Sequence, residues 1–253
     1  MLAATALLVL AVGAEAGGIT SSNVQFGPEG RYKGYLVRPT GTGPFPAVVV
    51  IHEWWGLNDN IRSEARKLAE AGYVALAVDL SGKTTSDPQE AMKQVQALDQ
   101  KAATAEMLAA TAFLRSQPFV KPDKVGSIGW CFGGLQSLHL ALNDPKLAAA
   151  VIYYGKPITD PKELAKIRAA VLGIFGEADE SIPMALVHQF VNALAEARVK
   201  HEVHTYPGAG HAFANPSGGS RYKPDAARDA WQKTLVFLGR YLSKQKAPAA
   251  AGR

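Results

Sequence analysis

The strongest nucleophile in this sequence is its single cysteine, Cys131, which lies in the stretch GWCFGG. A lone cysteine is more often a small buried hydrophobe. Here, however, glycines stand close on both sides of it, and the apolar run KVGSI comes just before. Residues 129–133 fit the nucleophile elbow, a strained strand-to-helix turn, with cysteine in place of serine. The helix N-terminus that follows such a turn favours thiolate, so we predict that Cys131 is a nucleophile.

A carboxylate and a histidine follow the cysteine along the chain. Asp179 comes directly after the run LGIFGEA, and His211 follows the run HTYPGAG. Nucleophile, histidine and carboxylate are the residue types of a catalytic triad. Glu53 closes a further apolar run, VVVIH, where a carboxylate is costly unless it has a partner. A salt-bridged strand end is the alternative interpretation of Glu53.

Strand and helix patterns alternate along the chain, and these elements must position the four residues. A hairpin is predicted from two strands, 22–26 and 31–39, around the turn 27–30. Apolar runs predict buried strands at 45–53, 73–80, 124–130, 148–155, 169–176 and 200–208. Helical spacing predicts helices at 58–73 (capped by Asn58 or Asp59), 88–115 (broken near Asp99), 135–142, 184–199 and 225–242. This alternation indicates an α/β fold with a mostly parallel sheet covered by helices on both faces.

The predicted strands also say where the chemistry should lie. In open α/β sheets, ligands bind beyond the carboxyl ends of the strands. Glu53, Cys131 and Asp179 each follow a predicted strand, and His211 follows the last of them. We therefore expect the four residues at one edge of the sheet.

The composition of the 253-residue chain is that of a globular protein, 47% hydrophobic and 19% charged. The net charge of +5 comes from scattered lysines and arginines, which argues against nucleic acid as a partner. One cysteine cannot form an internal disulfide. Without an internal repeat or a linker in mid-chain, residues 19–243 are predicted to form one domain.

The two ends of the chain differ from the rest. Residues 1–18 form an apolar run that closes on Ala-Glu-Ala, which resembles a secretory signal without its usual positive start. The run is too short to span a bilayer convincingly. We expect a periplasmic or secreted protein, or a cytoplasmic one if the leader is not processed. Residues 244–253 are predicted to be a flexible tail.

Five stretches together resemble the motifs of the dienelactone hydrolase family within the α/β-hydrolase fold: HEWWGLND, VDLSGK, GSIGWCFGG, GEADESIP and YPGAGHAF. They occur in the family's order between about residues 30 and 240. The cysteine elbow and the glutamate after the first buried strand are specific to this family. The aspartate and histidine motifs are shared with many hydrolases.

The resemblance implies a role for each residue. His211 would be the base toward Cys131 and later toward water, and Asp179 would fix the tautomer of His211. Glu53 would hydrogen-bond the resting thiol and help to deliver thiolate when substrate arrives. The backbone N–H groups of Trp54 and Phe132 would form the oxyanion hole.

The sequence departs from the family pattern at two substrate-binding positions. Relatives hold the substrate carboxylate with two arginines, and the matching positions here are Lys83 and Asn215. Lysine supplies a point charge without the bidentate fork of arginine, and Arg221 is a candidate to replace the second arginine. Trp54, Trp55 and Tyr153 are candidates to line an apolar pocket, or are packing residues.

We predict a hydrolase that cleaves lactones or activated esters through a thioester acyl-enzyme, with dienelactone as one candidate substrate. The alternatives are a general carboxylesterase and a non-catalytic relative whose cysteine serves redox sensing or ligand binding. No metal or organic cofactor is expected, and His201 and His204 should face opposite sides of a strand. The expected partner is a small lactone or ester substrate, with no nucleic acid and no membrane, and the protein is expected to be a monomer.

Overall fold

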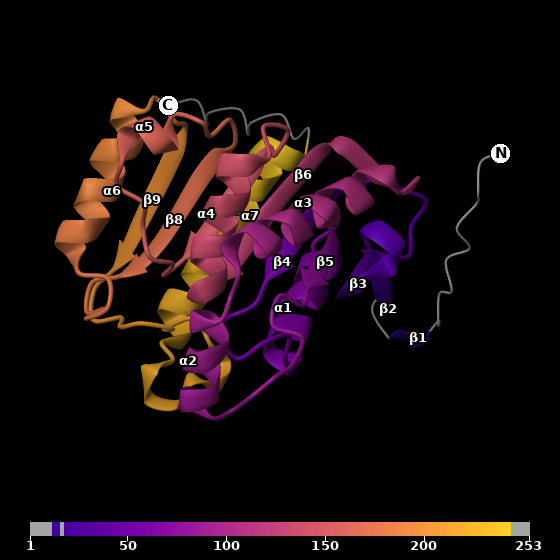
Figure 1. The fold of residues 1–253 in the computed structure, drawn as a ribbon, viewed down its shortest axis with the longest axis horizontal. Helices are drawn as coiled ribbons and strands as arrows, with labels where there is room; N and C mark the ends of the chain where they lie inside the picture. Colours follow the sequence, from indigo (N-terminus) through magenta and orange to yellow (C-terminus); the bar gives the residue numbers. More distant parts are fainter. Residues whose placement is uncertain (1–11, 16–17, 244–253) are drawn as a thin grey trace, which may run out of the picture.

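The computed structural model describes residues 12–15 and 18–243, and these contain a nine-stranded sheet in the order β1-β2-β3-β5-β4-β6-β7-β8-β9. The strands are β1 (Val12–Glu15), β2 (Ile19–Phe26), β3 (Tyr32–Pro39), β4 (Phe45–Ile51), β5 (Val74–Val78), β6 (Val120–Trp130), β7 (Ala149–Tyr153), β8 (Ala170–Gly176) and β9 (His201–Tyr206). From β5 to β9 across the sheet all neighbours pair in parallel, whereas β1, β2 and β3 pair antiparallel. Figure 1 shows β1–β3 at one end of the sheet and β8 and β9 at the other.

Helices cover both faces of this sheet. They are α1 (Asp59–Glu70), α2 (Pro88–Gln96), α3 (Gln100–Ser116), α4 (Phe132–Asn143), α5 (Pro161–Leu164), α6 (Met184–Glu196) and α7 (Pro224–Leu242), with short 3-10 helices η1 (Pro28–Gly30) and η2 (Pro216–Arg221). Along β4, Val48 and Val50 join a core cluster with α1 and α7, whereas Val49 and Ile51 join one with α3, α4 and α6. Because side chains alternate across a strand, β4 is buried on both faces, and the predicted α/β architecture is confirmed.

Local sequence signals begin and end these elements as expected. Asn58 caps α1 by accepting a hydrogen bond from the backbone N–H of Ile61 at 3.2 Å. Asp99 separates α2 from α3 and caps α3. The hairpin around residues 27–30 is present as β2 and β3. The sequence patterns did not predict α5, because its 4 residues are too few to show helical periodicity.

The order of the strands creates a switch point between β4 and β6. From β4 the chain moves to β5 on one side, and it then crosses to β6 on the other. Ligands in doubly wound sheets bind at such a point. The register pairs Ile51 with Gly129, so Glu53 and Cys131, each two residues further on, leave the sheet at the same level.

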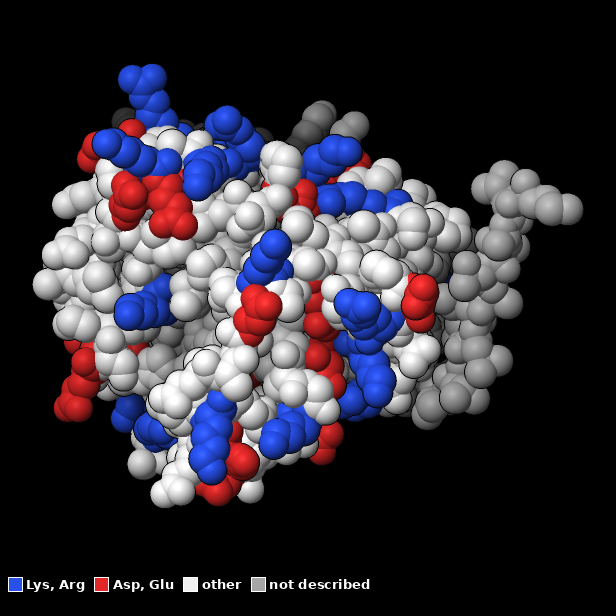
Figure 2. Space-filling model, in the orientation of Figure 1, with Lys and Arg blue, Asp and Glu red and all other residues white. Residues whose placement is uncertain are grey.

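Most of the predicted leader and the whole predicted tail fall on residues 1–11, 16–17 and 244–253, which lie outside the described residues. Within the leader, Val12–Glu15 forms β1 and pairs with β2. In the described part of the chain, no helix is both long and apolar enough to cross a bilayer. On the face shown in Figure 2, blue lysines and arginines are interspersed with red aspartates and glutamates.

Candidate active site at the carboxyl edge of the sheet

Cys131 is the one residue between the end of β6 and the start of α4. Its backbone has φ 55° and ψ −116°, a left-handed conformation that strains any residue other than glycine. The glycines on both sides permit this turn. A Cβ at Gly129 would overlap the carbonyl oxygen of Gly133, and a Cβ at Gly133 would overlap that of Ile51. The turn thus has the geometry of a nucleophile elbow.

Asp179 and His211 meet beyond the ends of β8 and β9. The Nδ1 atom of His211 lies 2.7 Å from Oδ2 of Asp179, whose side chain is buried. The other carboxylate oxygen accepts hydrogen bonds from the backbone N–H groups of Ser181 at 2.9 Å and Ile182 at 3.1 Å. Burial by itself would raise the pKa of Asp179, but these hydrogen bonds and the nearby His211 lower it. Asp179 is therefore an ionised carboxylate that holds His211 in one orientation.

His211 in turn contacts the thiol of Cys131. Burial lowers the pKa of His211, but the hydrogen bonds to Asp179 and Cys131 outweigh it and raise the pKa to about 10. Near neutral pH this histidine is therefore an imidazolium that lies beside the Asp179 carboxylate and Cys131. The structure thus brings three of the sequence-predicted residues together: Asp179 is hydrogen-bonded to His211, and Cys131 lies close enough to His211 to raise its pKa.

Glu53 lies buried beside this chain, with 2% of its surface exposed. Its Oε2 accepts a hydrogen bond from Nδ2 of Asn215 at 2.5 Å. Burial raises the pKa of Glu53 to about 7, against the lowering effects of Asn215, His211 and Arg221. Near neutral pH both forms of the carboxyl group are therefore populated. The family resemblance implies a hydrogen bond between Glu53 and the thiol, whereas here Glu53 accepts its hydrogen bond from Asn215.

Asn215, expected to bind substrate, is instead occupied by the protein itself. It is 7% exposed, its Nδ2 donates to Glu53, and its Oδ1 accepts from the backbone N–H of Ser217 at 2.8 Å. The second bond caps η2, so both polar ends of the amide are used. Asn215 therefore positions Glu53. Arg221, at the end of η2, is close enough for its charge to lower the pKa of Glu53.

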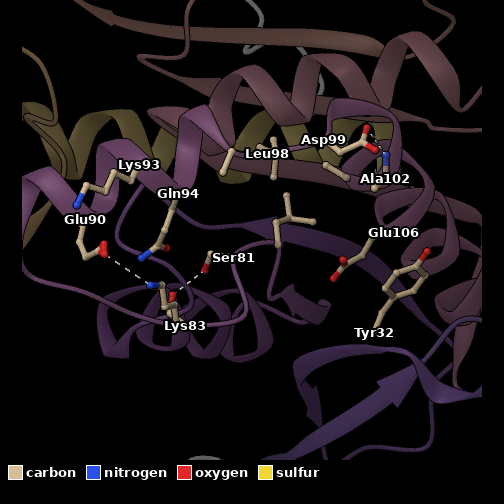
Figure 3. Close-up of a pocket in the computed structure, with 13 residues that line it drawn as sticks. Tyr32, Ser81, Lys83, Glu90, Lys93, Gln94, Leu98, Asp99, Ala102 and Glu106 are labelled. Carbon is tan, nitrogen blue, oxygen red and sulfur yellow. Dashed lines mark hydrogen bonds and ion pairs between the residues drawn. The ribbon is translucent and has the colours of Figure 1, made fainter.

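Lys83 lies in the loop after β5 and lines a pocket of about 470 Å3 (Figure 3). Its ammonium is exposed, and it lies 3.9 Å from Oε1 of Glu90. The rings of Trp54 and Trp55 contact each other at a tilt of 59°, with centroids 4.7 Å apart, and both residues are half-buried. Trp54 and Phe132 also border a smaller compartment beside this pocket.

The prediction for Tyr153 needs a correction, because its neighbour faces the site. Tyr153 is 1% exposed, its hydroxyl lies 2.7 Å from Oγ1 of Thr234, and it borders a different cavity. Tyr154, beyond the end of β7, has φ 36°, and its ring centroid lies 5.3 Å from that of His211. Its buried hydroxyl has no hydrogen-bond partner in the described part of the chain. Burial is the largest cause of the raised pKa of Tyr154, and the charges of Glu53 and Cys131 are the next largest.

Sequence reasoning missed Tyr154. The available signal was the doublet YYG at the end of a predicted strand. Neighbouring residues on a strand face opposite sides, so only one of the two tyrosines can face a given side. Which of the two tyrosines turns toward the edge depends on where the strand ends. The positive φ of Tyr154 is the backbone change that decides it.

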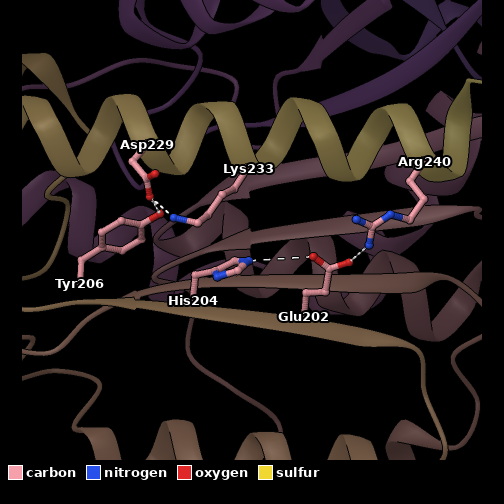
Figure 4. A network of polar contacts seen from close by, with 6 residues as sticks. All are labelled: Glu202, His204, Tyr206, Asp229, Lys233 and Arg240. Atoms are coloured by element: carbon pink, nitrogen blue, oxygen red, sulfur yellow. Dashed lines mark hydrogen bonds and ion pairs between the residues drawn. The ribbon is translucent and has the colours of Figure 1, made fainter. Parts of the chain in front are cut away.

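Within the described residues, no cluster of three or more histidine, cysteine, aspartate or glutamate side chains is arranged to hold a metal. His201 and His204 lie on β9, as expected. His204 belongs to a polar network between β9 and α7 (Figure 4), in which its Nε2 lies 3.9 Å from Oε2 of Glu202. The other members of the network are Tyr206, Asp229, Lys233 and Arg240.

Comparison with known proteins agrees with this geometry. The model of the dienelactone hydrolase family matches residues 32–242. A Synechocystis protein described as a carboxymethylenebutenolidase is 35% identical over 221 residues, covering 79% of this chain and 88% of the relative. A Bradyrhizobium protein described as a 2-oxo-3-(5-oxofuran-2-ylidene)propanoate lactonase is 33% identical over 218 residues, with 81% and 87% covered.

A solved structure described as a dienelactone hydrolase from Klebsiella pneumoniae superposes with a TM-score of 0.82. The two chains are 28% identical, and the match covers 88% of this chain and 99% of the other. Fold, sequence family and structural likeness all agree. The chain therefore belongs to the dienelactone hydrolase family, and it is a carboxylic ester hydrolase with the α/β-hydrolase fold.

Proposed function

We propose that the protein hydrolyses lactones or activated esters through a covalent thioester on Cys131. The observations that carry this proposal are the hydrogen bond between Asp179 and His211 and the closeness of Cys131 to His211, which raises the pKa of the histidine. The nucleophile lies at a strained elbow, its proton partner is beside it, and a buried carboxylate orients that partner. This is the arrangement that nucleophilic acyl transfer requires.

In the acylation step the Cys131 thiolate attacks the carbonyl carbon, and the carbonyl oxygen becomes an oxyanion. The backbone N–H groups of Trp54 and Phe132 stabilise it. Phe132 is the first residue of α4, so its N–H has no acceptor within the helix and is free for this role. When the tetrahedral intermediate collapses, the C–O bond breaks and His211 gives its proton to the leaving oxygen.

Deacylation uses the same groups in reverse. The now neutral His211 takes a proton from water, and the resulting hydroxide attacks the thioester carbonyl. The C–S bond breaks, the acid product leaves, and thiolate and imidazolium are restored. Asp179 stays ionised throughout and stabilises the imidazolium in both half-reactions.

Glu53 is proposed to take up the thiol proton whenever the cysteine is in its neutral form. With a pKa of about 7, part of Glu53 is ionised near neutral pH and can accept a proton. To do so, the carboxylate must leave Asn215 and turn toward the sulfur. A substrate that displaces the contact with Asn215 would thereby promote formation of thiolate.

The substrate class follows from the nucleophile and from the binding residues. A thiolate favours substrates with a good leaving group, such as an enolate, over ordinary alkyl esters and amides. Lys83 is exposed and can attract an anionic substrate, but Asn215 cannot replace the second arginine of the relatives because it is engaged with Glu53. We therefore expect less dependence on a substrate carboxylate.

Purified protein would be tested on dienelactone and on p-nitrophenyl acetate, beside Cys131→Ala and Cys131→Ser. We expect wild-type turnover of both substrates and none with the alanine variant. Faster turnover of plain alkyl esters than of either substrate would favour a general carboxylesterase. Equal rates in wild type and Cys131→Ala would refute the proposal. Peroxide-dependent dimerisation through Cys131 without turnover would favour the redox-sensing alternative.

A further inference from the structure

A small compartment beside the elbow is lined by two residues, His52 and Gln94, that carry three buried polar atoms with no protein partner in the described part of the chain. They are Nε2 of His52 and both amide atoms, Nε2 and Oε1, of Gln94. The compartment has a volume of about 10 Å3, and Trp54 and Phe132 form part of its wall. Unpaired buried polar atoms are costly, so atoms gathered around one space indicate a polar group that enters it.

The hydrogen-bonding character of His52 is fixed by its other ring nitrogen. Nδ1 lies 2.5 Å from the carbonyl oxygen of Glu53, an atom that only accepts, so Nδ1 carries the proton. His52 is 1% exposed, and burial lowers its pKa, so the ring is neutral. Nε2 is therefore an acceptor. Gln94 adds the NH2 group at Nε2, which has two protons to donate, and one acceptor, Oε1.

A larger pocket leads to this compartment. It is the pocket of about 470 Å3 that also contains Lys83, and the two spaces share Leu80, Ser81, Gln94 and Leu98 as lining residues. Figure 3 shows Gln94 above Ser81, with Lys93 and Glu90 on one side of it and Leu98 on the other. The compartment thus adjoins a pocket wide enough for part of a small organic molecule.

The three atoms select the chemical group that fits. A carboxylate has no proton to donate to His52, and an ammonium has no lone pair to accept from Gln94. A hydroxyl group can donate its proton to Nε2 of His52 and accept from Nε2 of Gln94, so it pairs one atom of each residue. Its size also suits a space that holds about one water-sized group.

We propose that this compartment is an acyl subsite that binds a hydroxyl group on the acyl part of the substrate. The assignment rests on the proposed function, in which Trp54 and Phe132 hold the acyl carbonyl oxygen. Because the same two residues border the compartment, the carbonyl group lies next to it. In this proposal the acyl chain, rather than the leaving group, extends toward His52 and Gln94. The preferred substrates are therefore hydroxylated lactones or esters.

The test compares the p-nitrophenyl esters of butyrate, α-hydroxybutyrate and β-hydroxybutyrate, which share one leaving group. We expect wild type to prefer at least one hydroxylated ester over butyrate by about tenfold in kcat/KM, the size of one hydrogen bond. In Gln94→Leu that preference should fall to about one. Gln96→Leu, at an exposed position of the same helix, is the matched control and should keep the wild-type preference.

Two results would overturn the subsite. One is equal kcat/KM for the three esters in wild type, which would mean that the compartment holds water only. The other is an unchanged preference in Gln94→Leu, with folding of the variant checked by circular dichroism. In both cases hydrolysis that is lost in Cys131→Ala would leave the proposed function standing. No hydrolysis of any ester would refute both proposals.

Discussion

The substitution Glu53→Gln removes a buried carboxyl group while keeping almost the same shape. In the folded protein the pKa of this carboxyl is raised from the ordinary 4.5 to about 7, chiefly by burial. Below pH 4.5 both the folded and the unfolded chain hold the proton. Between these two values the unfolded chain releases it and the folded protein retains it, so the free energy of unfolding falls as the pH rises. Above pH 7 the loss is complete.

The size of the effect follows from the two pKa values. Each pH unit between 4.5 and about 7 lowers the free energy of unfolding by up to about 1.4 kcal/mol, which gives about 3 kcal/mol in all. Glu53 is 2% exposed, so solvent screening reduces this figure little. Glutamine cannot ionise, and it keeps an oxygen that accepts the hydrogen bond from Asn215.

Urea denaturation of wild type and Glu53→Gln at several pH values between about 4 and 8 measures this contribution. Groups other than Glu53 titrate alike in both proteins, so their contributions largely cancel in the difference. Relative to the variant, wild type should lose about 3 kcal/mol across this range. Parallel curves for the two proteins, or a wild type that gains stability relative to the variant as the pH rises, would refute the argument from burial.

Three further substitutions, one of them with a matched control, test single contacts. Tyr154→Phe should raise the free energy of unfolding by about 1 kcal/mol in urea denaturation, because the hydroxyl is buried without a partner; a loss of stability would show that the hydroxyl is paired. Gly133→Ala should cost about 3 kcal/mol, since its Cβ would overlap the carbonyl oxygen of Ile51. In the control Gly218→Ala the new Cβ makes only ordinary van der Waals contacts, so the free energy of unfolding should change by no more than about 0.5 kcal/mol. Equal losses of stability in the two alanine variants would contradict the overlap described at Gly133. Asn58→Ala removes the cap of α1 and should lower the thermal midpoint, with a cost of about 1 kcal/mol; an unchanged midpoint would mean that solvent replaces the cap.

The sequence patterns predicted the features that depend on short-range order. The run of apolar residues before Cys131 and the glycines around it were sufficient to predict a strand, a tight turn and a helix, all of which are present. Asn58 and Asp99 were recognised as helix boundaries because capping acts over two or three residues. The parallel sheet followed from the alternation of strands and helices.

Contacts between distant segments escaped prediction. Asn215 and Glu53 are 162 positions apart, and no local pattern indicates that the amide of one donates to the carboxylate of the other. His52 was interpreted only as part of a strand, because its unpaired nitrogen is apparent only once α2 packs nearby. One backbone angle, the positive φ of Tyr154, decides which of the two tyrosines at residues 153 and 154 faces the site, and sequence periodicity does not specify that angle.

The most direct test of the catalytic proposal is to stop the reaction with p-nitrophenyl acetate early and to examine the peptide that contains Cys131 by mass spectrometry. We predict one acetyl group on Cys131, removable by hydroxylamine, formed at a rate at least equal to that of turnover, and absent in Cys131→Ala. Turnover of the ester without acetylation of Cys131, or with an acetyl group on another residue at the same rate, would contradict the thioester mechanism.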